Sequence, residues 1–183
     1  MAIALHWTIA ALIVANLLLG WTFRDFIPEL RIALIRTHKS IGLTVLALTL
    51  ARIGWRLAKP PPRLASHLAP VERLLARSTH FAFYVLLLAL PLVGWIVAST
   101  SVPTHPVLFW GAKLPSLPFL PAPPAPRRAL HGAVMVLHGD LALVFAALFA
   151  LHVAGALKHH FIDGDGQLFR ITPVGGPDKQ KPA

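Results

Sequence analysis

The chain contains no cysteine, and few of its residues carry charge. Without cysteine the protein can form no disulfide, no iron–sulfur cluster and no zinc site built on thiolates. Only 13% of its 183 residues are charged and 56% are hydrophobic, whereas a soluble domain carries about 25% charged residues. The scarcity of charge argues against an ordinary soluble domain and places the chain in a membrane.

Acidic residues are the scarcer of the charged types. Seven Asp and Glu stand against 17 Lys and Arg, which gives a net charge of +10. The basic residues flank apolar stretches, so we interpret them as topology signals and lipid contacts and expect no nucleic-acid partner. The length predicts one domain, which we place at residues 1–173, followed by a polar tail at residues 174–183.

Four apolar segments are each long enough to cross about 30 Å of hydrocarbon. We therefore predict an all-α fold, a four-helix transmembrane bundle. A cleavable signal peptide is the alternative for the first segment, but its basic start and small-residue cleavage site are not evident. A membrane helix tolerates an internal proline such as Pro91 as a kink. The segments run from Ile3 to Phe23, His38 to Leu57, Thr79 to Ser99 and Ala129 to Leu157.

The connections predict the orientation of the bundle. With the N-terminus inside, the cytoplasmic segments hold more Lys and Arg than the outside ones, so we expect both termini in the cytoplasm. The outside connection, Val102 to Pro126, is long and rich in proline. We expect four of its apolar side chains to lie at the interface or to cap the bundle: Phe109, Trp110, Leu117 and Phe119.

Histidines mark one face of the last segment. His131, His138, His152 and His159 follow a heptad stripe, and seven residues make almost two helical turns with about 20° of drift. His138 and His152 lie within the apolar part, fourteen residues or roughly 21 Å apart. A buried polar group in lipid costs several kcal/mol unless it is satisfied. Two buried imidazoles at different depths therefore suggest two stacked metal centres with partners from other helices.

The depth of the other histidines predicts those partners. His6 opens the first segment near the inside face, at the level of His152. His38 opens the second segment near the outside face, at the level of His138. Four-helix bundles commonly place cofactors between facing helices. The predicted pairs are therefore His6 with His152 and His38 with His138.

Haem is a cofactor that suits such pairs. Two histidines fill both axial positions of its iron, which favours electron transfer over oxygenation. Gly20, Gly42 and Gly94 would let a flat macrocycle approach the backbone, although plain helix packing explains them equally well. Cationic or polar side chains near the faces would bind the haem propionates: Arg52, Arg56 and His80 inside, and Arg24, Arg36 and Lys39 outside.

Several residues keep more than one interpretation. His80 is a candidate ligand, propionate contact or quinone contact. Asp140 is either a proton-relay group or the partner of a nearby arginine. Zinc chemistry fits poorly because the chain has no His-Glu-x-x-His motif, and a proton-coupled transporter usually has more acidic groups. We interpret the remaining histidines as ordinary interfacial or loop residues: His67, His105, His131, His159 and His160.

Five short motifs, taken in order, resemble the bacterial cytochrome b561 family. This family is grouped with the b-type cytochrome subunits of nickel-dependent hydrogenases and formate dehydrogenases. The similarity covers the chain from about Ile3 to Pro173. The motifs are LHW at Leu5–Trp7, HKSIGL at His38–Leu43, RIGWRL at Arg52–Leu57, HFAFYVLLLALPLVGW at His80–Trp95 and LHVAGALKHHF at Leu151–Phe161.

The resemblance implies a multi-pass cytochrome of the bacterial cytoplasmic (inner) membrane. It implies two b haems, with His6, His38, His138 and His152 as axial ligands, and electron transfer to or from quinone. Two departures stand out. Family members carry a longer segment before the LHW motif than the four residues here, and they often have Glu where Gly139-Asp140 follows the histidine.

Three functions remain open at this point. The first is electron transfer across the membrane. The resemblance implies superoxide as a candidate donor outside, and Lys113, Arg127 and Arg128 would steer such a small anion there. The second is a membrane anchor and electron conduit for a hydrogenase or dehydrogenase, docked at the proline-rich connection. A quinone-active monomer or homodimer would count against that second function. The third is a transporter or quinone-binding protein without haem.

Overall fold

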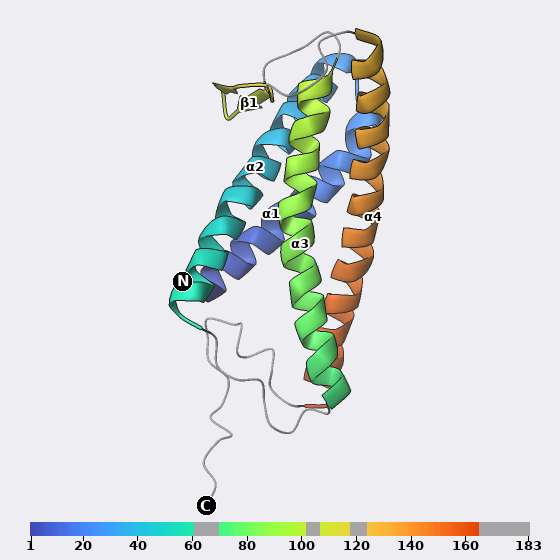
Figure 1. The fold of residues 1–183 in the computed structure, drawn as a ribbon. Helices are drawn as coiled ribbons and strands as arrows, with labels where there is room; N and C mark the ends of the chain where they lie inside the picture. Colours follow the sequence, from blue (N-terminus) through green and yellow to red (C-terminus); the bar gives the residue numbers. More distant parts are fainter. Residues whose placement is uncertain (61–69, 102–106, 118–123, 165–183) are drawn as a thin grey trace, which may run out of the picture.

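The fold is seen in a computed structural model that describes residues 1–60, 70–101, 107–117 and 124–164. Within these residues the predicted bundle is confirmed, because four long helices are each apolar enough to cross a membrane. A single 3₁₀ turn, η1 (Phe23–Asp25), follows the first helix. The helices are α1 (Ala2–Thr22), α2 (Pro28–Ala58), α3 (Pro70–Thr100) and α4 (Pro124–Phe161) (Figure 1).

The helices are longer than the apolar segments that predict them. α2 begins at Pro28 rather than at His38, and α4 begins at Pro124 rather than at Ala129. Hydropathy reports only the part of a helix that lies in hydrocarbon, whereas these helices continue into polar sequence. Proline in the first turn, where no backbone N–H is needed, marks the start of α2. As expected, α3 continues through Pro91.

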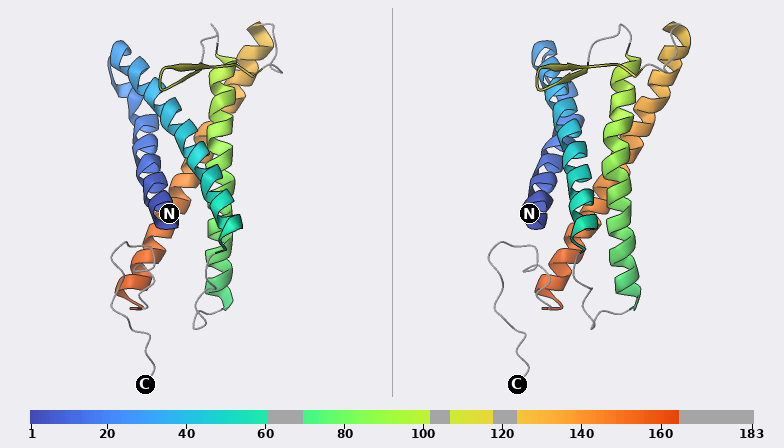
Figure 2. Two further views of the ribbon diagram at one scale, coloured as in Figure 1. Left: turned by 90° about the vertical axis from the view of Figure 1, so that its left-hand side faces the viewer. Right: turned by 60° about the vertical axis from the view of Figure 1, so that its left-hand side comes forward.

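The helices pack in chain order. α1 lies along α2, α2 contacts α3, and α3 packs along α4 (Figures 1 and 2). The start of α1 and the end of α4 lie at the same end of the bundle, which we call the terminal end. The turn from α1 to α2 and the start of α4 lie at the opposite end, which we call the hairpin end. Met1 and Phe161 thus lie at the same end of the bundle.

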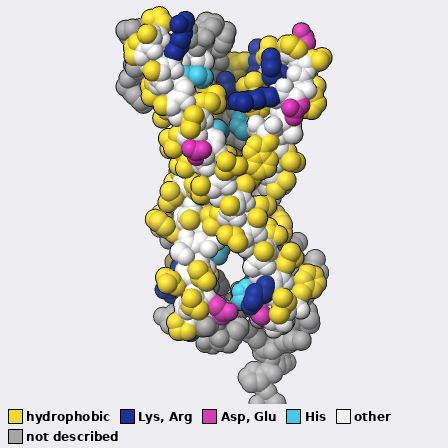
Figure 3. Space-filling view, turned by 90° about the vertical axis from the view of Figure 1, so that its right-hand side faces the viewer, with side chains coloured by type: hydrophobic (Ala, Val, Ile, Leu, Met, Phe, Trp, Pro, Cys, Tyr) yellow, Lys and Arg dark blue, Asp and Glu magenta, His cyan; other side chains and the backbone are white. Residues whose placement is uncertain are grey.

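The outer surface is apolar around its middle. Leu18 is 55% exposed and Leu151 is 70% exposed, and Figure 3 shows hydrophobic side chains over the waist of one face. On that face, Lys and Arg side chains gather near the two ends. Exposed apolar area of this extent marks a contact with lipid or with another protein. The distribution is that of a bundle whose middle is covered by hydrocarbon.

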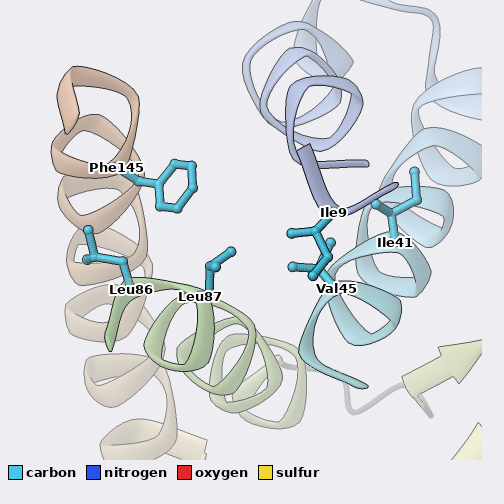
Figure 4. Packing of buried hydrophobic residues seen from close by; sticks show 6 residues of the cluster. All are labelled: Ile9, Ile41, Val45, Leu86, Leu87 and Phe145. Atoms are coloured by element: carbon cyan, nitrogen blue, oxygen red, sulfur yellow. The ribbon is translucent and has the colours of Figure 1, made fainter. Parts of the chain in front are cut away.

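The buried core is small and lies between the two ends. It consists of Ile9, Ile41, Val45, Leu86, Leu87 and Phe145, which come from all four helices (Figure 4). Phe145 is only 2% exposed, and its ring meets Phe83 edge to face with centroids 5.4 Å apart. This apolar plug separates the two levels at which the histidines lie.

A two-stranded β-hairpin lies at the hairpin end of the bundle, and the sequence analysis did not predict it. β1 (Val107–Phe109) pairs antiparallel with β2 (Ala112–Leu114). Its turn residues Trp110 and Gly111 both have positive φ, 47° and 94°, as a type I′ turn requires.

Hydrogen bonds tie the hairpin to α2. The Trp110 backbone N–H donates to Ser40 Oγ at 3.1 Å, and Ser40 Oγ donates to the Leu108 carbonyl at 3.3 Å. The Trp110 indole N–H donates to Thr44 Oγ1 at 3.1 Å. These hydrogen bonds therefore hold the hairpin beside the helix that carries His38.

The tail at residues 174–183 lies outside the described residues, as do His67, His105 and Phe119.

Candidate functional site

The hairpin-end pair joins α2 to α4. The rings of His38 and His138 have centroids 6.2 Å apart and planes at 83°. Two imidazoles that share one metal ion need ring centres roughly 6 Å apart, because each nitrogen–metal bond measures about 2 Å and each ring nitrogen lies about 1 Å from its centre. The structure thus brings this predicted pair together at a separation suited to a shared metal.

A backbone carbonyl orients the His38 ring. Nδ1 of His38 lies 3.0 Å from the carbonyl oxygen of Asn16. A carbonyl only accepts, so Nδ1 carries the proton and Nε2 keeps its lone pair. Histidines that bind metals typically donate their second ring N–H in this way. Sequence reasoning could not find this contact, because any residue type offers a carbonyl.

Two glycines make room for these rings. A Cβ added at Gly20 of α1 would lie 3.1 Å from Cε1 of His38, and one at Gly94 of α3 would lie 3.2 Å from Cε1 of His138. Both separations are too short for an undisturbed side chain. The sequence left a macrocycle contact and plain helix packing open for these glycines, and the structure adds that both lie directly against the imidazoles. Gly42 is less crowded, since its added Cβ would lie 3.6 Å from Asn16 Nδ2.

A cavity of about 320 Å³ opens around this pair. Cofactor and ligand pockets span about 300–1,000 Å³, so its volume is at the lower end of that range. Arg24 and Lys39 line it, as two of the three predicted outside cations. No Asp or Glu is among its lining residues in the described part of the chain. The donors, the glycines and the cations all fit a haem with its propionates at the hairpin end.

The terminal-end level holds three imidazoles rather than two. The rings of His6 and His152 have centroids 6.5 Å apart, so this predicted pair is also brought together. His80 lies closer still to His152, at 5.9 Å between centroids. Phe83 packs edge-on against the same His152 ring at 5.2 Å. The separations suit a shared metal for either pair.

Hydrogen bonds distinguish His6 from His80. Nη1 of Arg52 donates to Nδ1 of His6 at 3.1 Å. A guanidinium cannot accept, so Nδ1 of His6 is the acceptor and its neutral ring carries the proton on Nε2. His80 instead donates from Nδ1 to the Ala76 carbonyl at 2.7 Å, which leaves Nε2 open. His6 can ligate through Nε2 only if Arg52 turns to another acceptor, such as a carboxylate.

The terminal-end cavity is also smaller, at about 70 Å³. Arg52 lines it, whereas Arg56 lies over the Tyr84 ring, 5.9 Å from its centroid. Figure 3 shows imidazoles in a hollow near this end of the bundle. The donor set fits a haem here, but the side chains around it leave less space than at the hairpin end.

Three other predicted residues lie outside the two imidazole pairs. Asp140 is exposed and lines neither cavity, and His159 pairs with Asp163 at 3.0 Å near the end of α4. His131 is half-buried and lines the hairpin-end cavity, and its interpretation as an ordinary interfacial residue stays a prediction. As the heptad stripe predicts, it lies within α4 on the face of His138.

Comparison with known proteins shows the family of the chain. A profile of the family described as prokaryotic cytochrome b561 matches residues 1–173. "Cytochrome b561 homolog 2" of Escherichia coli (strain K12) is 31% identical over 186 residues, covering 96% of this chain and 90% of that protein.

Two further relatives are more distant. "Probable superoxide oxidase CybB" of Yersinia pestis is 26% identical over 175 residues, covering 93% of each chain. "Cytochrome b561 homolog 1" of E. coli (strain K12) is 26% identical over 174 residues, covering 93% of this chain and 94% of that protein. On the match along nearly its whole length, the chain is a multi-pass membrane protein that belongs to the prokaryotic cytochrome b561 family.

Proposed function

We propose that the protein is a di-haem b-type cytochrome that carries electrons across the membrane to or from quinone. Membership of the cytochrome b561 family implies haem b. The observation that carries the proposal is the presence of two imidazole pairs, with ring centroids 6.2 Å and 6.5 Å apart, at opposite ends of one bundle. α4 supplies one imidazole to each pair, so a single helix spaces the two centres.

His38 and His138 would hold one haem, and His6 and His152 the other. Haem b supplies reversible one-electron chemistry when it is bound, and the protein sets its ligation, spacing and burial. His138 and His152 are fourteen residues apart, which is roughly 21 Å along the axis of α4. Phe145 lines both cavities and, with the core around it, keeps water out of the space between them.

Cations at each level would bind the haem carboxylates. Arg24 and Lys39 line the hairpin-end cavity, and Arg52 lines the terminal-end cavity. An anionic carboxylate in a membrane protein is costly unless it is paired. These side chains would hold the haem carboxylates toward an end of the bundle.

The orientation and location follow from the charge distribution. We place the terminal end in the cytoplasm, the hairpin end outside and the bundle in the bacterial inner membrane. Superoxide is a candidate donor at the hairpin end, because one relative is named a probable superoxide oxidase. Lys113 of β2 and Arg127 and Arg128 of α4 lie at that end and would attract a small anion.

Visible spectroscopy of the purified protein in quinone-containing liposomes tests this proposal. We expect b-type absorbance and two haems per chain, with reduction by a quinol or by superoxide. Superoxide dismutase, added as a control, should abolish reduction by superoxide while leaving reduction by quinol intact. A protein without haem absorbance would contradict the proposal, and a soluble subunit that co-purifies in equal amount would favour the membrane-anchor function instead.

A further inference from the structure

His131 has no part in either axial pair, yet it lines the hairpin-end cavity with His38 and His138. It lies seven residues before His138, roughly 10 Å nearer the hairpin end along α4. Nδ1 of His131 is 3.1 Å from Oγ1 of Thr100 on α3. His131 is thus a half-buried imidazole that is bonded to a neighbouring helix and lies on the hairpin-end side of a proposed axial ligand. This placement suggests that it has a function of its own.

The Thr100 hydroxyl fixes which nitrogen of His131 faces a partner. Thr100 is fully buried, at 0% exposure. Its Oγ1 lies 2.8 Å from the Ile96 carbonyl and 3.1 Å from the Val97 carbonyl. Carbonyls only accept, so the hydroxyl proton is donated to them and Oγ1 accepts the Nδ1–H of His131. Nε2 is therefore the ring nitrogen that remains for a group in the cavity.

The charges around the cavity indicate what that group is. Arg24 and Lys39 line the cavity together with His131, and none of its described lining residues is acidic. Two cations in a largely apolar cavity favour an anionic oxygen group. Nε2 of His131 would add a hydrogen bond to such a group, with one proton shared between the nitrogen and the oxygen.

We propose that His131, oriented by Thr100, binds a carboxylate of the haem held between His38 and His138. Arg24 and Lys39 share that carboxylate or bind its neighbour. The inference rests on the proposed function, since it needs a haem at this level. The hydrogen bond holds one proton between Nε2 and a carboxylate oxygen. His131 is thus a positioning residue for the macrocycle and not an axial ligand.

Four variants separate the two nitrogens of the ring. His131→Asn puts an amide near the position of Nδ1 and nothing at Nε2, whereas His131→Gln puts an amide near Nε2. Thr100→Val keeps the shape of the side chain and removes the hydroxyl. Thr37→Val is the matched control, because the Thr37 hydroxyl makes the same kind of bond, 3.0 Å to the Ala33 carbonyl. The measurements are haem content, the rate of haem transfer to an apo-globin, and both midpoint potentials.

We expect His131→Asn and Thr100→Val to release the hairpin-end haem about tenfold faster, the size of a lost charge-assisted hydrogen bond. Its midpoint potential should fall, because an uncompensated carboxylate favours ferric iron. His131→Gln and Thr37→Val should resemble the wild type, and the terminal-end haem should not change. Wild type without haem would contradict the proposed function itself. If the wild type holds two haems and His131→Asn releases them no faster, this inference alone is overturned. It is also overturned if His131→Asn changes only the salt dependence of reduction by superoxide.

Discussion

The two ends of the bundle use the same ligand chemistry in different surroundings. At each end an imidazole of α4 faces one from another helix, 6.2 Å away at the hairpin end and 6.5 Å at the terminal end. The hairpin-end cavity measures about 320 Å³ and the terminal-end cavity about 70 Å³. A backbone carbonyl holds His38, whereas a guanidinium holds His6. The comparison shows that the surrounding helices can place the same pair of imidazoles in two different environments.

The neighbours of the imidazoles also differ. Glycines lie against the rings at the hairpin end, while Phe83 and a third imidazole, His80, pack against His152 at the terminal end. At the hairpin end, packing therefore leaves His38 as the imidazole that faces His138. At the terminal end, packing leaves two partners for His152, and substitution has to separate them.

The largest expected effect comes from removing one of those two partners. His6→Ala should lose one of the two haems, because we assign His6 as the axial partner of His152. His80→Ala should keep both haems and change only the spectrum of the terminal-end one. Haem content per chain and reduced-minus-oxidised spectra at low temperature measure this. The reverse result would make His80 the ligand and leave His6 as a contact of Arg52.

A second substitution tests the packing of the hairpin end. Gly94→Val should expel the hairpin-end haem, since its Cβ alone would lie 3.2 Å from Cε1 of His138. Overpacking of this kind typically costs about 1–3 kcal/mol of stability. The matched control is Gly155→Val on α4, where an added Cβ meets nothing within 4 Å. Two haems in Gly94→Val would show that the His138 ring can move without consequence.

A third substitution tests the guanidinium of the terminal end. Arg52→Leu should release the terminal-end haem about tenfold faster, because a hydrogen bond to a charged group contributes about 1.5–3 kcal/mol. The hairpin-end haem should be unaffected. Arg56→Leu is the control, since Arg56 lies over the Tyr84 ring and outside the cavity lining. If both variants release the terminal-end haem at the same rate, Arg52 does not contribute to binding this haem.

The smallest expected effect concerns the hairpin. Ser40→Ala removes two hydrogen bonds that fasten the hairpin to α2, each with a net contribution of about 1 kcal/mol. Limited proteolysis within residues 107–117 should become faster while both haems are retained. Ser78→Ala, which loses only bonds to carbonyls of its own helix, is the control. Loss of the hairpin-end haem in Ser40→Ala would instead make the hairpin part of the site.

The sequence was sufficient for the bundle and for both histidine pairs. Hydropathy locates helices that cross hydrocarbon, and the heptad spacing of His138 and His152 puts them on one face at two depths. These signals belong to single helices. The contacts of His38 with Asn16 and of His6 with Arg52 depend on which helices are neighbours. Hydropathy and spacing along one helix do not carry that information.

The same limit explains the position of two other histidines. His131 lies within α4 on the predicted stripe, but its contact with Thr100 depends on how α4 packs against α3. His80 was placed at the correct end, but its approach to His152 depends on how α3 packs against α4. The hairpin was also missed, because its turn is Trp110-Gly111 rather than a residue pair typical of type I′ turns.

Haem quantitation in wild type, His138→Ala and His152→Ala tests the central claim most directly. The account predicts two haems per chain in the wild type and one in each variant. The haem that remains should be the terminal-end one in His138→Ala and the hairpin-end one in His152→Ala, distinguished by their midpoint potentials. Full occupancy of both haems in either variant would contradict the account.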